Sequence, residues 1–269
     1  MSTNRRLKAV LLAISALVLV FVYLPLAVVF VNSFSISPTF TWPPPGWTLQ
    51  WWRLAFHSAG ARDALLTSVE VALCATAIAL VLGTLAGLAL RRTRFFGRNV
   101  VSLLIILPIA LPGIVTGIAL NNAFRTMLGV DLGFVTIVIA HATFCIVTVF
   151  NNMQARLQRI GPSLEQASAD LGAGPFRTFA LVTFPMLRSA LLAGALLAFG
   201  LSFDEIVVTT FTAGPQVQTL PLWIFQNLFR PNQAPVVNVV AAVLVLTSAI
   251  PIYFAQRLSG DSVNATAAP

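Results

Sequence analysis

The chain has 269 residues, of which 58% are hydrophobic and 9% are charged, and its formal net charge is +8. Soluble domains carry about 25% charged residues, so this composition excludes a surface that faces water and favours one that faces lipid. The basic residues flank apolar stretches, as in membrane proteins, and form none of the continuous stripes that bind nucleic acid. We therefore predict an all-α, polytopic membrane helix bundle, in contact with the lipid bilayer and without a nucleic-acid partner.

Six stretches are candidates for transmembrane helices, each of which needs about 20 mostly apolar residues. Five of them lie at about 9–31, 64–90, within 99–124, within 132–155 and at about 236–256. A signal peptide is the rival interpretation of the first, but its apolar run is too long and no clear cleavage site follows, so we expect a retained anchor. The third contains Pro108 and Pro112, which are expected to kink or break its helix, although ordinary packing also accommodates prolines.

The second stretch also holds two glycines at a spacing that suits close helix contact. Gly83 and Gly87 form a pair of small residues four positions apart, the pattern that lets two membrane helices approach each other. A chance position facing lipid is the alternative.

The fifth stretch is bounded by charged residues. Arg188 and Asp204 enclose the run 189–203, which is too short to cross a bilayer comfortably. The helix must therefore include Asp204 and Glu205 and continue to about Phe211, or begin before Arg188. Either choice keeps the two carboxylates at or near membrane depth.

The distribution of Lys and Arg predicts that both termini are cytoplasmic. Of the 16 basic residues, 12 lie in one alternating set of segments: Arg5, Arg6, Lys8, Arg91, Arg92, Arg94, Arg98, Arg156, Arg159, Arg177, Arg188 and Arg257. The other set holds four: Arg53, Arg62, Arg125 and Arg230. Excess basic residues stay on the cytoplasmic side. An even number of spans follows, which supports counting the fifth and predicts six in all.

The predicted outer segment 32–63 is rich in proline and tryptophan. It contains three consecutive prolines, 43–45, and four tryptophans: Trp42, Trp47, Trp51 and Trp52. Tryptophan favours the interface between lipid and water, so this segment is interpreted as an interfacial anchor, with a ligand contact as the alternative.

The predicted cytoplasmic loop 151–188 is long and patterned. Apolar residues recur there at helical spacing and are expected on one helix face: Leu157, Ile160, Leu164, Ala167 and Leu171. Gly161-Pro162 indicates a turn, and Ser163 can cap a helix of about 163–171 that Gly172 ends. Its carboxylates, Glu165 and Asp170, are expected on the polar face. Such a helix lies on lipid or docks into a partner, and its acidic residues favour a protein partner.

This loop resembles the EAA loop of ABC importer permeases. Gln166-Ala167-Ser168 occupies the first triplet of that pattern, Gly172 its glycine, and Val182, Phe184 and Pro185 its tail. Gln166 and Ser168 depart from the usual glutamate and alanine, and Glu165 stands one position early. The resemblance implies a single permease domain, 1–269, with an ATPase-coupling loop at 151–188. The coupling residues it implies are Glu165, Gln166, Ala167, Ser168, Asp170, Gly172 and Pro185.

Further stretches are similar to permeases of the spermidine/putrescine class, in particular its PotC-like subunit. They are Tyr23-Leu-Pro25, Asn32-Ser-Phe34, Leu107-Pro-Ile-Ala-Leu-Pro112 and Leu201-Ser-Phe-Asp-Glu-Ile-Val-Val208. The resemblance implies a multi-pass protein of the bacterial inner membrane that is not an enzyme. It also implies a second permease subunit, expected to be a different, PotB-like chain, two ATP-binding subunits and an extracytoplasmic solute-binding protein. This chain has no G-x-x-x-x-G-K-[ST] loop, so ATP and Mg are expected on the partner ATPase and no cofactor on this chain.

Asp204 and Glu205 are the candidate substrate-pathway residues. A carboxylate at the centre of a membrane helix costs about 2.5–3.5 kcal/mol, so the pair needs a cation, water or protonation. One interpretation is attraction of a cationic substrate such as a polyamine. The alternative is an ion pair with an arginine such as Arg125 or with the second subunit. Adjacent helical residues diverge by about 100°, so only one carboxylate is expected to face the pathway.

The remaining signals are weaker. Trp223 and Asn227, after Gly214-Pro215 and Pro221, are candidates for an outer gate, with binding-protein docking or plain loop structure as alternatives. The lone histidines His57 and His141 predict no metal site, and His141 is expected to be hydrogen-bonded inside the bundle. We predict no catalytic residues, because the span that holds Ser202 contains no histidine. A self-sufficient secondary transporter is the rival function, but the two halves show no internal repeat.

Overall fold

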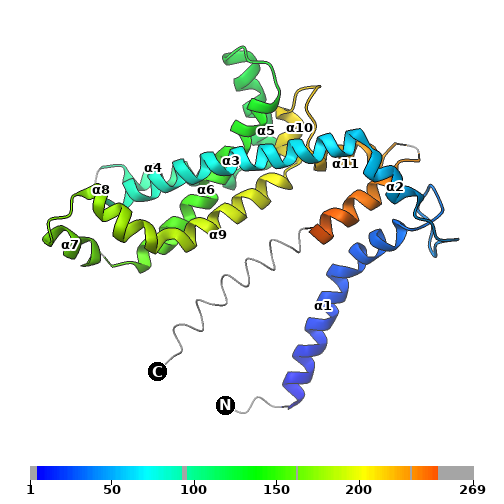
Figure 1. Cartoon of the computed structure of the whole chain (residues 1–269), viewed down its shortest axis with the longest axis horizontal. Coiled ribbons are helices and arrows are strands. Elements are labelled where there is room, and N and C mark those ends of the chain that lie inside the picture. The colour runs from blue at the N-terminus through cyan, green and yellow to red at the C-terminus, as the bar shows by residue number, and fades with distance from the viewer. Residues whose placement is uncertain (1–4, 93–95, 162, 231, 248–269) are drawn as a thin grey trace. The chain divides into compact units, whose positions relative to one another are not determined.

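The computed structural model describes residues 5–92, 96–161, 163–230 and 232–247 (Figure 1). Within these ranges the chain is helical and forms no strand beyond one isolated bridge between Ser35 and Trp47. The chain divides into two compact units, one of Met1–Arg62 with Trp223–Pro269 and one of Asp63–Leu222.

The first unit begins with α1 (Arg5–Asn32), an apolar helix long enough to cross a membrane. The tryptophan-rich segment follows it and packs onto α2 (Gln50–His57). Phe34 stacks on Trp52 at 5.1 Å between ring centroids, and the Trp51 indole N–H donates to the Ser35 carbonyl at 2.8 Å. This predicted outer segment therefore has a fixed structure despite its prolines.

Among the described residues, four helices are long and apolar enough to cross a membrane, or five if a bent pair counts as one span. The sixth predicted stretch is helical over Ala234–Thr247, and the rest of it lies outside the described residues. The six-span count and the cytoplasmic termini therefore stay predictions.

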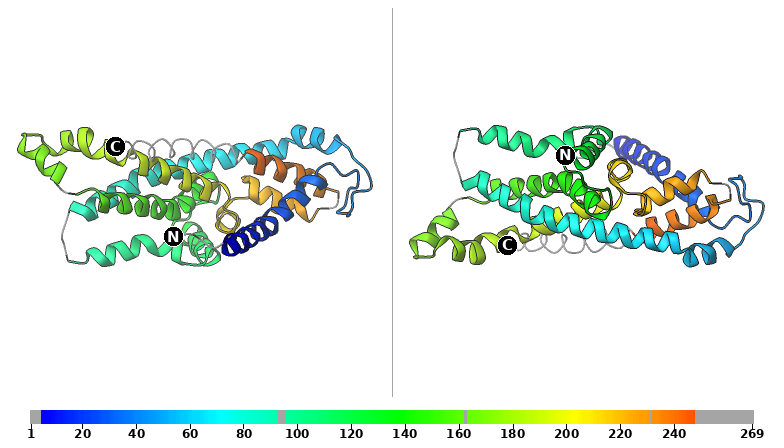
Figure 2. Two further views of the ribbon diagram at one scale, coloured as in Figure 1. Left: turned by 90° about the horizontal axis from the view of Figure 1, so that it is seen from below. Right: turned by 90° about the horizontal axis from the view of Figure 1, so that it is seen from above.

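The second unit is built around α6 (Phe134–Arg159), which runs antiparallel to α9 (Phe184–Phe203) (Figure 2). Contacts follow one register along the pair: His141 with Ser202, Cys145 with Ala198, and Val149 with Gly194. These side chains are small or buried, and α6 supplies much of the apolar core of the unit.

The long helix α3 (Ala59–Arg92) packs on α6 through the two glycines. A Cβ placed on Gly83 would lie 2.9 Å from the Ile146 carbonyl oxygen, and one on Gly87 would lie 3.3 Å from Met153 Cβ. The prediction of close helix contact is confirmed, and a position facing lipid is excluded for both glycines.

The third predicted span is broken. The helices α4 (Arg98–Ala110) and α5 (Gly113–Asn122), with the π-helical turn η1 (Ala123–Met127) after α5, meet at an angle of 104°. Leu111 is extended, as expected for the residue before a proline, and Pro112 starts α5. The predicted break is confirmed, but it produces two half-length helices. The second of them packs on α10 (Val207–Thr212), where Gly117 lies against the ring of Phe211.

The fifth span begins before Arg188, which was the second of the two alternatives that the sequence left open. A helical run of 29 residues, Pro175–Phe203, comprises α8 (Pro175–Thr178), the π-helical turn η2 (Phe179–Thr183) and α9. It is about 43 Å long at 1.5 Å per residue, comparable to a whole bilayer with its headgroups. Continuation to Phe211 as one helix is wrong, because α9 ends at Phe203 and α10 is separate.

Pro185 accounts for the irregular turn in this run. A proline lacks the N–H for a helical hydrogen bond and its ring crowds the carbonyl four residues earlier. The carbonyl four residues before Pro185 is that of Leu181, which lies in the wider π-helical turn η2.

Candidate functional site

The acidic pair lies in a short turn between α9 and α10, at the end of the helical run opposite α7 (Ser163–Asp170) (Figure 1). Asp204 closes α9, its backbone N–H donating to the Gly200 carbonyl at 3.1 Å. Its side chain is exposed, and the structure records no hydrogen bond or ion pair to its carboxylate from the described residues. Asp204 therefore forms no ion pair with Arg125, which is among the described residues.

Glu205 has a different role from its neighbour. Its half-buried carboxylate accepts a 2.8 Å hydrogen bond from the Val208 backbone N–H, in the first turn of α10. A carboxylate at this place satisfies a free helix N–H and opposes the positive end of the helix dipole. The structure thus separates the two acids: Glu205 caps a helix, and the Asp204 carboxylate makes no hydrogen bond or ion pair with the described residues.

His141, a residue of α6, is fully buried and contacts α9 and α10 on either side of this turn. Its Nδ1 is 2.8 Å from the Ser202 hydroxyl and its Nε2 is 2.9 Å from the Thr209 hydroxyl. The expectation of a hydrogen-bonded histidine is confirmed. Its partners Ser202 and Thr209 are 61 and 68 positions away in the chain, so no local sequence pattern indicates them.

This arrangement does place a histidine beside Ser202, which the sequence analysis did not foresee. Both side chains are nevertheless inaccessible, with Ser202 3% exposed and His141 0% exposed. The second ring nitrogen faces a threonine and not a carboxylate, so the group lacks the acid of a Ser-His-Asp arrangement. The pair is a buried structural contact and not a nucleophile.

Trp223 and Asn227 lie on α11 (Leu220–Leu228) within the first unit and are buried there. The Asn227 amide donates to the Trp223 carbonyl at 2.8 Å, and the Trp223 indole lies 3.1 Å from a Cβ built on Gly60. Their side chains are engaged inside their own unit. The predicted outer gate stays a prediction.

The predicted coupling helix is present as α7, between α6 and α8. Gly172 follows it with φ = +79°, the left-handed geometry that favours glycine, as predicted. Two hydrogen bonds hold α7 to the following helical run. The Thr183 hydroxyl donates to Glu165 Oε1 at 2.8 Å, and the Ser168 and Thr178 hydroxyls are 3.0 Å apart.

These contacts correct two expectations. Glu165 turns toward its own chain, so it does not share the polar face expected for it with Asp170. The five apolar residues do not form one helix face, because α6 ends at Arg159 and α7 begins at Ser163. Leu157 is buried in the core, whereas Leu171 is 88% exposed.

The opposite face of α7 is open to a partner. Of the predicted coupling residues, Gln166, Ala167, Asp170, Gly172 and Pro185 are exposed, and so are the apolar residues Leu164 and Leu171 of this segment. Two arginines fasten the base of this segment: Arg91 donates to the Ile160 carbonyl at 2.8 Å, and Arg156 donates to the Met186 carbonyl at 3.0 Å. The predicted coupling segment is thus held to its own chain by hydrogen bonds, and both apolar and polar side chains are exposed on its other face.

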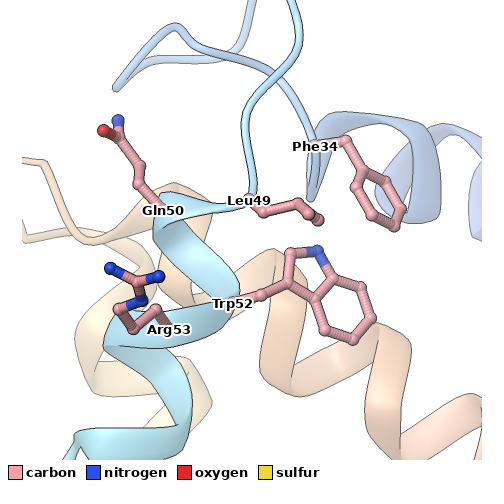
Figure 3. A pocket seen from close by; sticks show the side chains of 5 residues that line it. All are labelled: Phe34, Leu49, Gln50, Trp52 and Arg53. Atoms are coloured by element: carbon pink, nitrogen blue, oxygen red, sulfur yellow. The ribbon is translucent and has the colours of Figure 1, made fainter.

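A pocket of about 510 Å³ lies in the first unit, at the tryptophan-rich segment (Figure 3). Its lining residues are Phe34, Leu49, Gln50, Trp52 and Arg53. Among these five residues, only Arg53 is charged, and its guanidinium repels cations. The pocket therefore does not suit the cationic substrate proposed for the acidic turn. No cluster of metal-ligating side chains occurs among the residues that the structure describes.

Comparisons with known proteins identify relatives of most of the chain. The family model of the binding-protein-dependent transport system inner membrane component matches residues 79–264. The chain is 34% identical over 232 residues to the putrescine transport system permease protein PotI of Escherichia coli (strain K12), covering 84% of this chain and 82% of that protein. It is 31% identical over 244 residues to the spermidine/putrescine transport system permease protein PotC of the same strain, covering 91% of both.

Two further similarities bear on substrate and fold. The putative 2-aminoethylphosphonate transport system permease protein PhnV of Salmonella typhimurium (strain LT2) is 33% identical over 224 residues, covering 82% of this chain and 83% of that protein. A bacterial ABC transporter involved in the import of the acidic polysaccharide alginate has a chain that matches with a TM-score of 0.68 and 16% identity, covering 97% of this chain and 99% of that chain. The last likeness concerns the fold alone. The relatives are permeases and not enzymes, as the sequence predicted.

Proposed function

The chain belongs to the family of inner-membrane components of binding-protein-dependent transport systems, and we propose that it forms half of the translocation pathway of a polyamine importer. As a multi-pass permease of this family, it works with a partner permease, an ATPase and a solute-binding protein. Membership of this family also excludes a self-sufficient secondary transporter.

The observation that carries the polyamine proposal is the exposed carboxylate of Asp204, which has no partner among the described residues. An exposed carboxylate in the turn that ends this helical run can attract a cationic substrate. Polyamines carry several ammonium groups, each able to occupy this position in turn as the substrate moves. Two relatives are permeases for putrescine and for spermidine and putrescine, which supports the same substrate class. Glu205 contributes negative potential while it caps α10.

The proposal for coupling rests on the outer face of α7. Gln166, Ala167, Asp170 and Leu171 are exposed and available to a cleft on the ATPase, while Glu165 and Ser168 tie the helix to its own chain. ATP and Mg then bind to two ATPase subunits, and the second permease is a different, PotB-like chain. This chain itself needs no cofactor.

Uptake of radiolabelled putrescine and spermidine into cells lacking their own polyamine importers tests the substrate. The Asp204→Asn variant should lower uptake about 10- to 150-fold, since a charge-assisted contact is worth about 1.5–3 kcal/mol. Asp131→Asn is the matched control, because Asp131 is also exposed but lies in the loop before α6. Equal uptake by the two variants, at equal amounts of protein in the membrane, would remove Asp204 from the pathway.

A permease for a different small solute is the second candidate. The similarity to PhnV supports it, because that relative is nearly as similar to this chain and its putative substrate carries a phosphonate. Binding of putrescine, spermidine and 2-aminoethylphosphonate to the cognate solute-binding protein separates the two. Tight binding of the phosphonate alone would overturn the polyamine assignment and leave the family assignment intact.

A further inference from the structure

Two hydroxyls on either side of the acidic turn meet on one buried histidine. Ser202 lies in the last turn of α9, two residues before Asp204, and Thr209 lies in α10, four residues after Glu205. Both hydroxyls are within 2.9 Å of a ring nitrogen of His141. A side chain of a third helix, α6, therefore links the two helix ends that flank the turn with the acids.

The direction of each hydrogen bond follows from the number of available protons. The Thr209 hydroxyl donates its only proton to the Glu205 backbone carbonyl at 2.8 Å, so it can only accept from His141. His141 Nε2 therefore carries the ring proton, and in the neutral ring Nδ1 accepts from Ser202. One chain of hydrogen bonds runs from Ser202 through His141 and Thr209 to the main chain of Glu205.

The same turn is also fixed at its carboxylate. Glu205 Oε1 accepts from the Val208 N–H, so both the main chain and the side chain of Glu205 are held by α10. Asp204 stands between Ser202 and Glu205, and its own carboxylate is free of contacts among the described residues. Its carboxylate is thus positioned through the residues on both sides and through the hydrogen bond from its own backbone N–H to the Gly200 carbonyl.

A purely space-filling role would not require this histidine. Burying a polar ring is unfavourable unless its hydrogen bonds are made, and an apolar side chain avoids that cost. A fully satisfied buried network instead favours one geometry over alternatives. His141 satisfies both nitrogens, and the ring of Phe144 lies beside it at 5.4 Å between centroids.

We propose that His141 is a positioning residue for transport, which holds the Asp204-Glu205 turn in the geometry that meets the substrate. This inference rests on the proposed function of Asp204. His141 acts through Ser202 and Thr209 and does not touch the substrate. Loss of its bridge leaves the helices packed but lets the acidic turn adopt other orientations.

The test uses the complete importer, with its partner permease, ATPase and binding protein, in proteoliposomes. The measured quantity is putrescine taken up per ATP hydrolysed, beside the ATPase rate and the amount of assembled complex. Thr209→Val is the main variant. Thr212→Val is its matched control, because the Thr212 hydroxyl is also buried in α10 and bonds the carbonyl four residues earlier, that of Val208, but does not contact His141.

Thr209→Val should lower the uptake per ATP about tenfold, as expected for a buried partner left unpaired, with assembly and ATPase rate close to those of Thr212→Val. Ser202→Ala, which removes only the bond to Nδ1, should act in the same direction. His141→Gln should restore part of the ratio lost in His141→Ala, because its amide supplies a donor. If Thr209→Val does not assemble, Ser202→Ala is judged by the same criterion.

Combination with Asp204→Asn distinguishes positioning from a general structural role. If His141 acts through the acidic turn, Thr209→Val should have little further effect once Asp204 is neutral. Equal ratios for Thr209→Val and Thr212→Val, or a full additional loss in the Asp204→Asn background, would overturn the inference alone. Normal transport by Asp204→Asn itself would overturn the proposed function, and the positioning inference with it.

Discussion

Replacing Gly83 by alanine tests how closely α3 packs on α6. The added Cβ would lie 2.9 Å from the Ile146 carbonyl oxygen and 3.0 Å from Val149 Cβ. Carbon atoms pack best at about 3.5–4.0 Å. Neither neighbour is the end of a flexible side chain, so one helix has to shift. Such overpacking costs about 1–3 kcal/mol.

Gly200 in α9 is the matched control, because a Cβ there meets no atom within 4 Å. Alanine at either position gains up to about 1 kcal/mol of helix propensity over glycine. We therefore expect Gly200→Ala to stabilise the protein by up to about 1 kcal/mol and Gly83→Ala to destabilise it by about 0–2 kcal/mol. The difference between the two is the cost of overpacking, which corresponds to roughly 2–12 °C in Tm at about 2–4 °C per kcal/mol.

Thermal unfolding of the purified importer in lipid nanodiscs measures this difference. Both variants must be compared at the same lipid composition and with the same partner subunits, because bound partners raise the apparent stability. Equal melting temperatures for Gly83→Ala and Gly200→Ala would refute the close contact between α3 and α6, and with it the core described for the second unit.

Two further predictions concern α7. Leu171→Asp should weaken co-purification of the ATPase at least about tenfold without changing the Tm measured in the absence of the ATPase, because an 88% exposed side chain contributes to a partner surface and little to the fold. Leu128→Asp, at the residue after η1 and 66% exposed, is its control, and full ATPase retention by Leu171→Asp would contradict the coupling assignment. Thr183→Val removes the hydrogen bond to Glu165 and should loosen α7 by about 1 kcal/mol, seen as faster hydrogen exchange over 163–172. Thr148→Val, whose hydroxyl bonds within α6, should leave that exchange unchanged; equal exchange in both variants would show that Glu165 does not fasten α7.

The class of protein and most of the helices follow from the sequence alone. Apolar length and charge placed α1, α3 and α6 within a few residues, because a lipid-facing helix must satisfy its backbone internally and be apolar over its whole length. The break after Pro108 and the helix at Ser163 were also predicted, since proline and glycine act on the backbone locally. The residues that resemble the EAA loop identified the family before any fold was known.

Only the tertiary structure decided what the individual polar side chains do. Asp204 and Glu205 are neighbours with the same charge, yet only Glu205 caps α10. The reason is that α9 ends at Phe203 and α10 begins at Val207, which places the Glu205 carboxylate at the N-terminus of α10. Glu165 faces its own chain because a π-helical turn brings Thr183 beside it. His141 meets Ser202 and Thr209 across helices, and no local periodicity relates residues 61 and 68 positions apart. Hydrophobic patterns specify which faces are buried, whereas hydrogen bonds between helices depend on register, which exists only once the helices have packed.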